Sequence, residues 1–82
     1  MLKVSVISPE SVLFEGETDA VVAPAYDGEI GILTGHAPLM ALLGEGQLRL
    51  GGGSGGRFNI SGGFMQVLNN DVRVVTEKAT AA

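Results

Sequence analysis

The chain has 82 residues, a net charge of −4 and no cysteine. This length fits one domain that depends on its hydrophobic core, because neither disulfides nor thiolate metal sites are available. The chain is acidic and has no basic stripe, so we expect no nucleic-acid partner. No apolar run reaches the roughly 20 residues of a membrane span. We therefore expect a soluble, cytoplasmic domain without direct membrane insertion.

Apolar and polar residues alternate with a period of two along the first part of the chain, which predicts β-strands. The first strand covers residues 2–6, with Leu2, Val4 and Val6 on one side. The second covers residues 12–15 and ends at Gly16. The third covers residues 18–23 and ends at Pro24.

Residues 27–39 read DGEIGILTGHAPL and contain three glycines and a proline, which exclude a helix. We expect an acidic turn, a short strand, a second tight turn and the start of another strand. Residues 38–43 are too short for an independent helix and are interpreted as a strand.

The second half continues the alternation, and four further strands are predicted over residues 47–50, 57–60, 64–68 and 72–76. Leu48, Leu50, Phe58 and Ile60 are expected to point inward. Strands separated by turn residues at this spacing are typical of an all-β sandwich or barrel.

The connections in this half have distinct compositions. The segment GGGSGG over residues 51–56 predicts a flexible hairpin connection, and Asn69-Asn70-Asp71 predicts a tight turn. Ser61-Gly62-Gly63-Phe64 lacks the lysine of a phosphate-binding loop and predicts a bulge or a sharp corner. Lys78 and the three alanines that follow resemble the first turn of a helix.

The candidate chemistry is presentation of charge, and we expect no catalytic, cofactor-binding or metal site. His36 is the only histidine, and no nucleophile or orienting carboxylate accompanies it in a motif. Asp27 and Glu29 flank Gly28 and place two acids on an exposed turn. Because residues 1–45 carry one base against seven acids, this turn suits a basic protein partner.

Several motifs occur in an order that resembles one family. They are Ser8-Pro9-Glu10, Val12-Leu13-Phe14-Glu15-Gly16-Glu17, Val21-Val22-Ala23-Pro24, Asp27-Gly28-Glu29-Ile30-Gly31-Ile32-Leu33, Gly35-His36-Ala37-Pro38-Leu39, Gly46-Gln47-Leu48-Arg49, Ser61-Gly62-Gly63-Phe64-Met65-Gln66-Val67 and Val72-Arg73-Val74-Val75. Together they resemble the N-terminal β-sandwich domain of the epsilon subunit of F-type ATP synthases, which is called delta in mitochondria. The match runs from about residue 2 to residue 79.

The resemblance implies a flattened sandwich of two five-stranded, mostly antiparallel sheets. It also implies a non-catalytic rotor subunit in the central stalk that joins the gamma subunit to the membrane c-ring and couples rotation to ATP synthesis. The complex would lie on the cytoplasmic side of the bacterial inner membrane as a peripheral assembly.

Carried over by position, the resemblance implies two contact sets. The c-ring contact would be Tyr26, Asp27, Gly28 and Glu29, and the gamma contact would be His36, Leu39, Met40 and Ala41.

The family pattern continues into a C-terminal helical hairpin that carries inhibition and, in some members, ATP binding. We therefore expect residues 1–78 to form the β-sandwich domain and residues 79–82 to begin a helical region that is otherwise absent, so the inhibitory role is not expected here.

Two other classes remain open from the residues alone. A generic β-sandwich adhesion or carbohydrate-binding module would need exposed aromatic residues on a concave face. A small jelly-roll enzyme would need a pocket with converging titratable groups.

Overall fold

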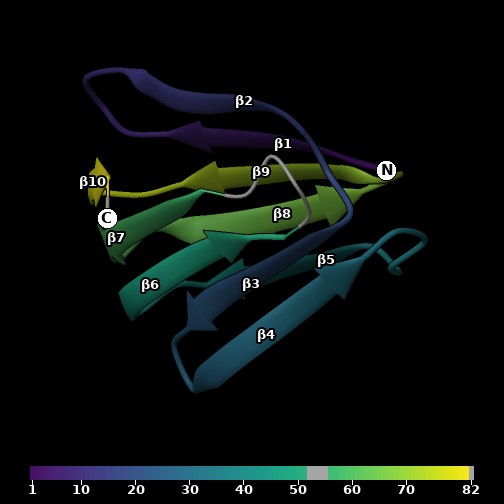
Figure 1. Cartoon of the computed structure of the whole chain (residues 1–82). Helices are drawn as coiled ribbons and strands as arrows, with labels where there is room; N and C mark the ends of the chain where they lie inside the picture. Colours follow the sequence, from purple (N-terminus) through teal and green to yellow (C-terminus); the bar gives the residue numbers. More distant parts are fainter. Residues whose placement is uncertain (52–55, 82) are drawn as a thin grey trace.

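Ten β-strands in two five-stranded sheets, packed face to face, make up the computed structural model, which describes residues 1–51 and 56–81 (Figure 1). The strands are β1 (Leu2–Ile7), β2 (Val12–Thr18), β3 (Ala20–Ala25), β4 (Gly28–Leu33), β5 (Leu39–Leu42), β6 (Glu45–Leu50), β7 (Arg57–Ser61), β8 (Phe64–Leu68), β9 (Asp71–Val75) and β10 (Lys78–Ala81). The predicted all-β sandwich is confirmed. In the described part of the chain, no helix is long and apolar enough to cross a membrane.

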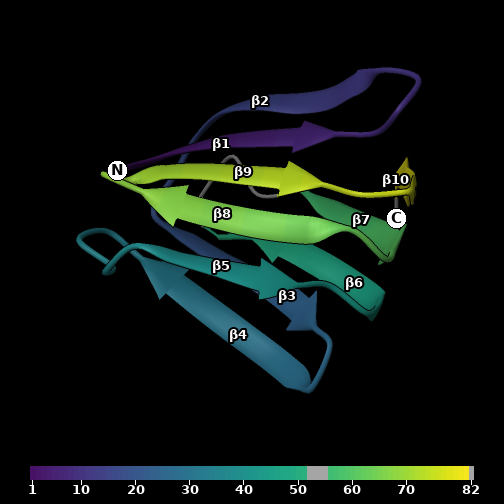
Figure 2. The same ribbon diagram turned by 180° about the vertical axis from the view of Figure 1, so that it is seen from behind.

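The first sheet has the strand order β2-β1-β9-β8-β5, and the second has β10-β7-β6-β3-β4. The second sheet is fully antiparallel, whereas the first contains one parallel pair, β1 with β9. Figure 2 shows the first sheet from its outer side, with β5 at one edge and β2 at the other. The two sheets meet at the end of β5, where an isolated bridge joins Leu43 to Ala25 at the end of β3.

The core lies between the sheets and is built from the inward residues that the alternation predicts. Branched aliphatic residues and one methionine dominate it, and all are buried: Leu2, Val4, Val6, Val21, Ala23, Ile32, Leu43, Leu48, Leu50, Phe58, Ile60, Met65, Val67, Val72 and Val74. The rings of Phe14 and Phe58 meet edge to face at 6.4 Å between centroids. Close packing of this kind resists deformation.

Several predicted boundaries are wrong, including the start of the third strand, because Thr18 ends β2 and β3 begins at Ala20. Residues 78–81 do not start a helix but form β10, which pairs with β7 from Lys78–Ser61 to Ala81–Phe58. β2 continues through Gly16 to Thr18 because it pairs with β1 along its whole length. β3 includes Pro24. Proline has no N–H to donate, but β3 pairs with β6 only at Val21 and Val22, so Pro24 removes no hydrogen bond between these two strands.

Buried threonines hold two of the connections that pass from one sheet to the other. The Thr18 hydroxyl, at the end of β2, donates to the Gly51 carbonyl oxygen. The Thr76 hydroxyl, after β9, lies 3.0 Å from the Gly62 carbonyl oxygen and 2.9 Å from that of Lys78. Both side chains are buried, and these bonds satisfy polar groups that would otherwise destabilise the core.

The predicted corner and tight turn are confirmed. Gly62 and Gly63 have φ values of 72° and 103°, and Asn69 and Asn70 have φ values of 50° and 63°. A Cβ on Gly63 would lie 2.0 Å from the Val75 carbonyl oxygen, so two backbones approach closely there. The hairpin connection predicted for residues 51–56 lies largely outside the described residues.

Candidate partner-binding surface

The acidic turn (Tyr26, Asp27, Gly28 and Glu29) joins β3 to β4 at one corner of the sandwich. Ala25 pairs with Gly28, so Tyr26 and Asp27 form the two-residue connection. Gly28 has φ 136°, a conformation that glycine adopts without strain. All four residues are exposed, and Tyr26 is 80% exposed. The turn therefore presents one aromatic ring and two carboxylates at the surface.

Backbone contacts tie the acidic turn to β5 in the other sheet. The Tyr26 N–H donates to the Leu42 carbonyl oxygen at 2.9 Å, and an isolated bridge joins Ala25 to Leu43. The hollow beside them has a volume of about 790 Å³ and is lined by residues 25–30 with Ala41 and Leu42. All four residues predicted for the c-ring contact border this hollow, whereas Ala41 is the one member of the predicted gamma set that lines it.

The residues predicted for the gamma contact divide between the two sides of β5 and the loop before it. Leu39 is partly buried and packs against the core, and Ala41 points the same way. Met40 points outward and is 65% exposed. Leu42, which the sequence interpretation missed, is 68% exposed. Alternation along the strand could have found Leu42, because it shares the outer side with Met40.

His36 lies in the loop between β4 and β5 and is half-buried. Its Nδ1 is 2.7 Å from the Ala37 carbonyl oxygen, which only accepts, so this contact requires the ring protonated on Nδ1. The Asn70 side-chain oxygen accepts a hydrogen bond from the Gly35 N–H at 2.7 Å. The loop is therefore anchored to the β8–β9 turn, 35 residues away in sequence.

An apolar row crosses the outer face of the first sheet at one end. Strand register places Leu42 opposite Phe64, Phe64 opposite Val75, Val75 opposite Ile7 and Ile7 opposite Val12. The three central residues are partly exposed, and the outer two, on the edge strands β5 and β2, are more than half exposed. Contiguous apolar surface on a small domain is typical of a contact face.

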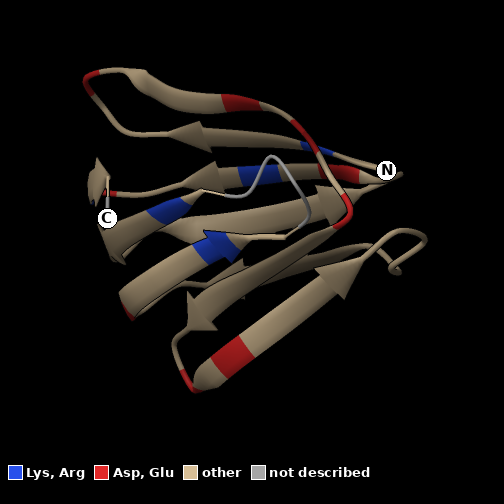
Figure 3. Cartoon of the chain, in the orientation of Figure 1, with Lys and Arg blue, Asp and Glu red and all other residues tan. Residues whose placement is uncertain are grey.

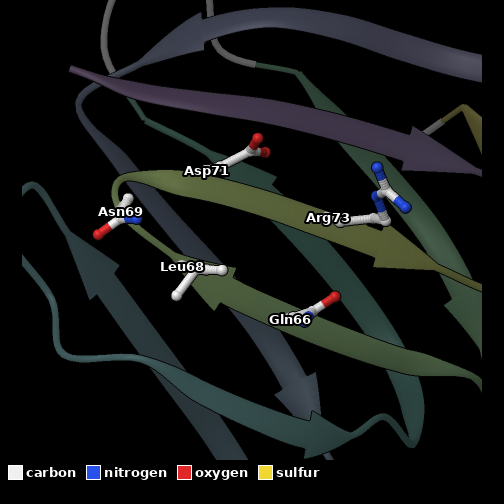
Figure 4. A pocket seen from close by; sticks show the side chains of 5 residues that line it. All are labelled: Gln66, Leu68, Asn69, Asp71 and Arg73. Carbon is white, nitrogen blue, oxygen red and sulfur yellow. The ribbon is translucent and has the colours of Figure 1, made fainter.

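A second hollow lies over β8, β9 and the turn that joins them. Figure 4 shows Gln66, Leu68, Asn69, Asp71 and Arg73 around an open hollow of about 340 Å³ on β8, β9 and their turn. This set includes no nucleophile and no histidine. Within residues 1–51 and 56–81, no cluster of three or more histidine and acidic side chains could hold a metal ion. The absence of a catalytic site and of a metal site stays a prediction.

The aromatic residues give no support to a carbohydrate-binding face. Phe58 is buried, Phe14 and Phe64 are half-buried, and only Tyr26 of the four aromatic residues is exposed. A single exposed ring on a turn does not form the stacking platform that sugar binding needs.

Fold and surface together define a small β-sandwich in which an exposed acidic turn lies beside an apolar sheet edge. The sequence matches the family described as "ATP synthase, Delta/Epsilon chain, beta-sandwich domain" over residues 1–82. The chain therefore belongs to this family, as the resemblance implied.

Curated relatives named ATP synthase epsilon chain agree with this assignment. That of Leptospira interrogans is 43% identical over 77 residues, which are 93% of this chain and 61% of the relative. That of Desulforamulus reducens is 45% identical over 98% of this chain and 61% of the relative. The chain thus spans about three-fifths of their length. One from Chlorobium limicola is 40% identical, and the match covers 92% of this chain and 88% of that protein.

Solved structures share the fold. A chain in the Euglena gracilis mitochondrial ATP synthase (OSCP/F1/c-ring) superposes with a TM-score of 0.89 at 24% identity, over 98% of this chain and 52% of that one. A chain in the central stalk and c-ring assembly of the Tetrahymena thermophila mitochondrial ATP synthase gives 0.77 at 16% identity, over 96% of this chain and 65% of that one.

Proposed function

We propose that this domain is a non-catalytic rotor element of the central stalk in a proton-translocating F-type ATP synthase. It joins the gamma subunit to the c-ring and so couples rotation to ATP synthesis, as a peripheral part of the complex on the cytoplasmic side of a bacterial inner membrane. Family membership supports this role, and so do the relatives named ATP synthase epsilon chain.

The observation that carries the proposal is the arrangement at one corner of the sandwich. The acidic turn, with Asp27 and Glu29, borders the same hollow as Leu42 at the end of β5, and a backbone hydrogen bond connects the two. A coupling element needs two different contact surfaces on a stiff body, so that a displacement at one reaches the other. Here the acidic turn meets the c-ring, and the outer side of β5 with the His36 loop meets gamma.

The direct test is association of the purified domain with its two partners. Immobilised domain should retain the gamma subunit from the same organism, and a detergent-solubilised c-ring should bind more tightly to the domain–gamma complex than to gamma alone. Failure to retain gamma would refute the rotor role. An unrelated β-sandwich of similar net charge serves as the control for non-specific retention.

Charge reversal on the acidic turn should weaken binding to the c-ring without unfolding the domain. We expect Glu29→Lys or Asp27→Lys to lower c-ring affinity, because the turn would then repel a basic loop. Thermal unfolding should shift little, since exposed ion pairs contribute about 0–1 kcal/mol. Affinity is measured by co-sedimentation with c-rings. Asp71, an exposed acid at the start of the central strand of the first sheet, supplies the matched control Asp71→Lys. Undiminished binding by both turn variants would refute the c-ring assignment.

The isolated domain should be a monomer that self-associates weakly. Met40, Leu42 and Val12 are all more than half exposed on the first sheet, and bare apolar surface favours association at high concentration. Sedimentation velocity should show a weight-average mass that rises gradually with concentration. A dimer that persists on dilution into the low-micromolar range would contradict the expectation.

A further inference from the structure

Glu29 of the acidic turn already has a cationic partner within the chain. Arg49 Nη2 donates to Glu29 Oε2 at 2.8 Å. Arg49 belongs to β6 and Glu29 to β4, so the contact crosses the strand between them, β3. Arg49 is opposite Val22 of β3. Val22 is in turn opposite Gly31, which is two residues beyond Glu29 on β4. Only one carboxylate oxygen takes part in this contact.

A second arginine directs Arg49 toward the turn. Arg57 of β7 lies directly opposite Arg49, and like charges in that relation repel each other. On the other side, β3 offers only the apolar Val22 and Pro24 before Glu29 is reached. Figure 3 shows the two basic segments side by side on β6 and β7 and the acidic segment on the far edge strand β4. Repulsion and attraction therefore act on Arg49 in the same direction.

The ion pair is exposed enough to be exchanged. The Arg49 and Glu29 side chains are 42% and 60% exposed, and such pairs contribute about 0–1 kcal/mol. A cation from a partner can replace Arg49 at small cost. While Arg49 stays, however, the partner meets a turn whose two negative charges are offset by one positive charge.

From this geometry we infer that Arg49 is an intramolecular competitor that limits the affinity of the acidic turn for a basic partner and keeps the contact exchangeable. The inference rests on the proposed function in one respect, namely that the acidic turn receives a basic partner. It adds a specificity-determining residue outside the turn.

Two charge-matched variants test the inference. Arg49→Gln and Arg57→Gln each remove one positive charge, but only Arg49 contacts Glu29. The probes are a tetralysine peptide, followed by NMR shifts of the Gly28 and Glu29 amides, and a detergent-solubilised c-ring. We expect Arg49→Gln to tighten peptide binding about three- to fivefold at low salt, and Arg57→Gln to tighten it less than half as much. In a Glu29→Gln background the two variants should become equal.

The outcomes separate this inference from the proposed function. The inference would be overturned if the two variants had equal effects on peptide binding. It would also be overturned if Arg49→Gln bound the peptide more weakly, which would mean that Arg49 positions Glu29 instead. Tighter peptide binding by Arg49→Gln with unchanged c-ring binding would uphold competition at Glu29 and refute the assignment of the turn to the c-ring. Tighter binding to both probes supports both proposals.

Discussion

Replacing Gly63 with alanine is expected to lower the free energy of unfolding by about 3 kcal/mol or more. The new Cβ would lie 2.0 Å from the Val75 carbonyl oxygen and 2.7 Å from the Thr76 Cα, and both are backbone atoms that cannot rotate away. The φ value of 103° adds strain for any residue with a side chain. A domain of this size has a total stability of about 4–12 kcal/mol, so the variant should be largely unfolded at moderate urea concentrations.

Gly31→Ala is the matched control for this experiment. Gly31 lies within β4. A Cβ there would meet nothing within 4 Å, and its φ is outside the left-handed region. Its urea midpoint should equal or slightly exceed that of the unchanged domain, because alanine restricts the unfolded chain. If Gly63→Ala unfolds at the same urea concentration as Gly31→Ala, the close approach of β8 to the end of β9 is wrong.

The local alternation of residues was enough to predict most strands and their inward sides. Leu2, Val4 and Val6, for example, are buried as expected, because a half-buried strand places successive side chains on opposite faces. The corner at Gly63 could also be predicted, since two adjacent glycines between strands allow two backbone segments to approach closely.

The features that the sequence did not predict depend on pairing between strands that are far apart in the chain. The segment 78–81 is rich in alanine, a strong helix former, yet its pairing with β7 makes it a strand. Propensity is a weak guide when an open sheet edge offers backbone partners. The parallel pairing of β1 with β9 joins residues about seventy positions apart in the chain, such as Lys3 and Asp71, and no local pattern specifies it.

The candidate surface shows the same division. The exposed acids of the turn were predicted, because an Asp-Gly-Glu turn between strands must face solvent. Its link to Arg49 was not, since Glu29 and Arg49 are 20 residues apart and meet only through the register of three strands. The helical start predicted for residues 79–82 is replaced by β10 over Lys78–Ala81.

The proposed coupling role requires a stiff body, and the structure shows where the stiff connection lies. The corner that holds the acidic turn is joined to β5 by the Tyr26–Leu42 hydrogen bond, and to the segment that follows β5 by the Gly44–Pro24 hydrogen bond of 2.8 Å. Leu43, between these contacts, is buried in the core. A force applied at the turn therefore reaches β5 through backbone bonds and packed side chains, without a flexible connection between them.

If the proposed gamma contact lies on the outer side of β5, gamma binding should depend on Met40 and Leu42. The double variant Met40→Thr with Leu42→Thr is expected to weaken gamma binding by about 2 kcal/mol or more, which is about 30-fold. Both side chains are about two-thirds exposed in the free domain, so they are available to fill pockets in a partner. Threonine favours strands and adds no charge, so the urea midpoint should change little. Binding is measured by titration of the domain into purified gamma.

Val12→Thr is the control on the opposite edge of the same sheet, where Val12 is 56% exposed. Gamma binding should be unchanged by this substitution if the contact is centred on β5. A loss equal to that of the double variant would mean that gamma covers the whole apolar row from Leu42 to Val12. Full gamma affinity in the double variant would exclude β5 from the interface, because a well-packed contact cannot lose two central apolar side chains without cost.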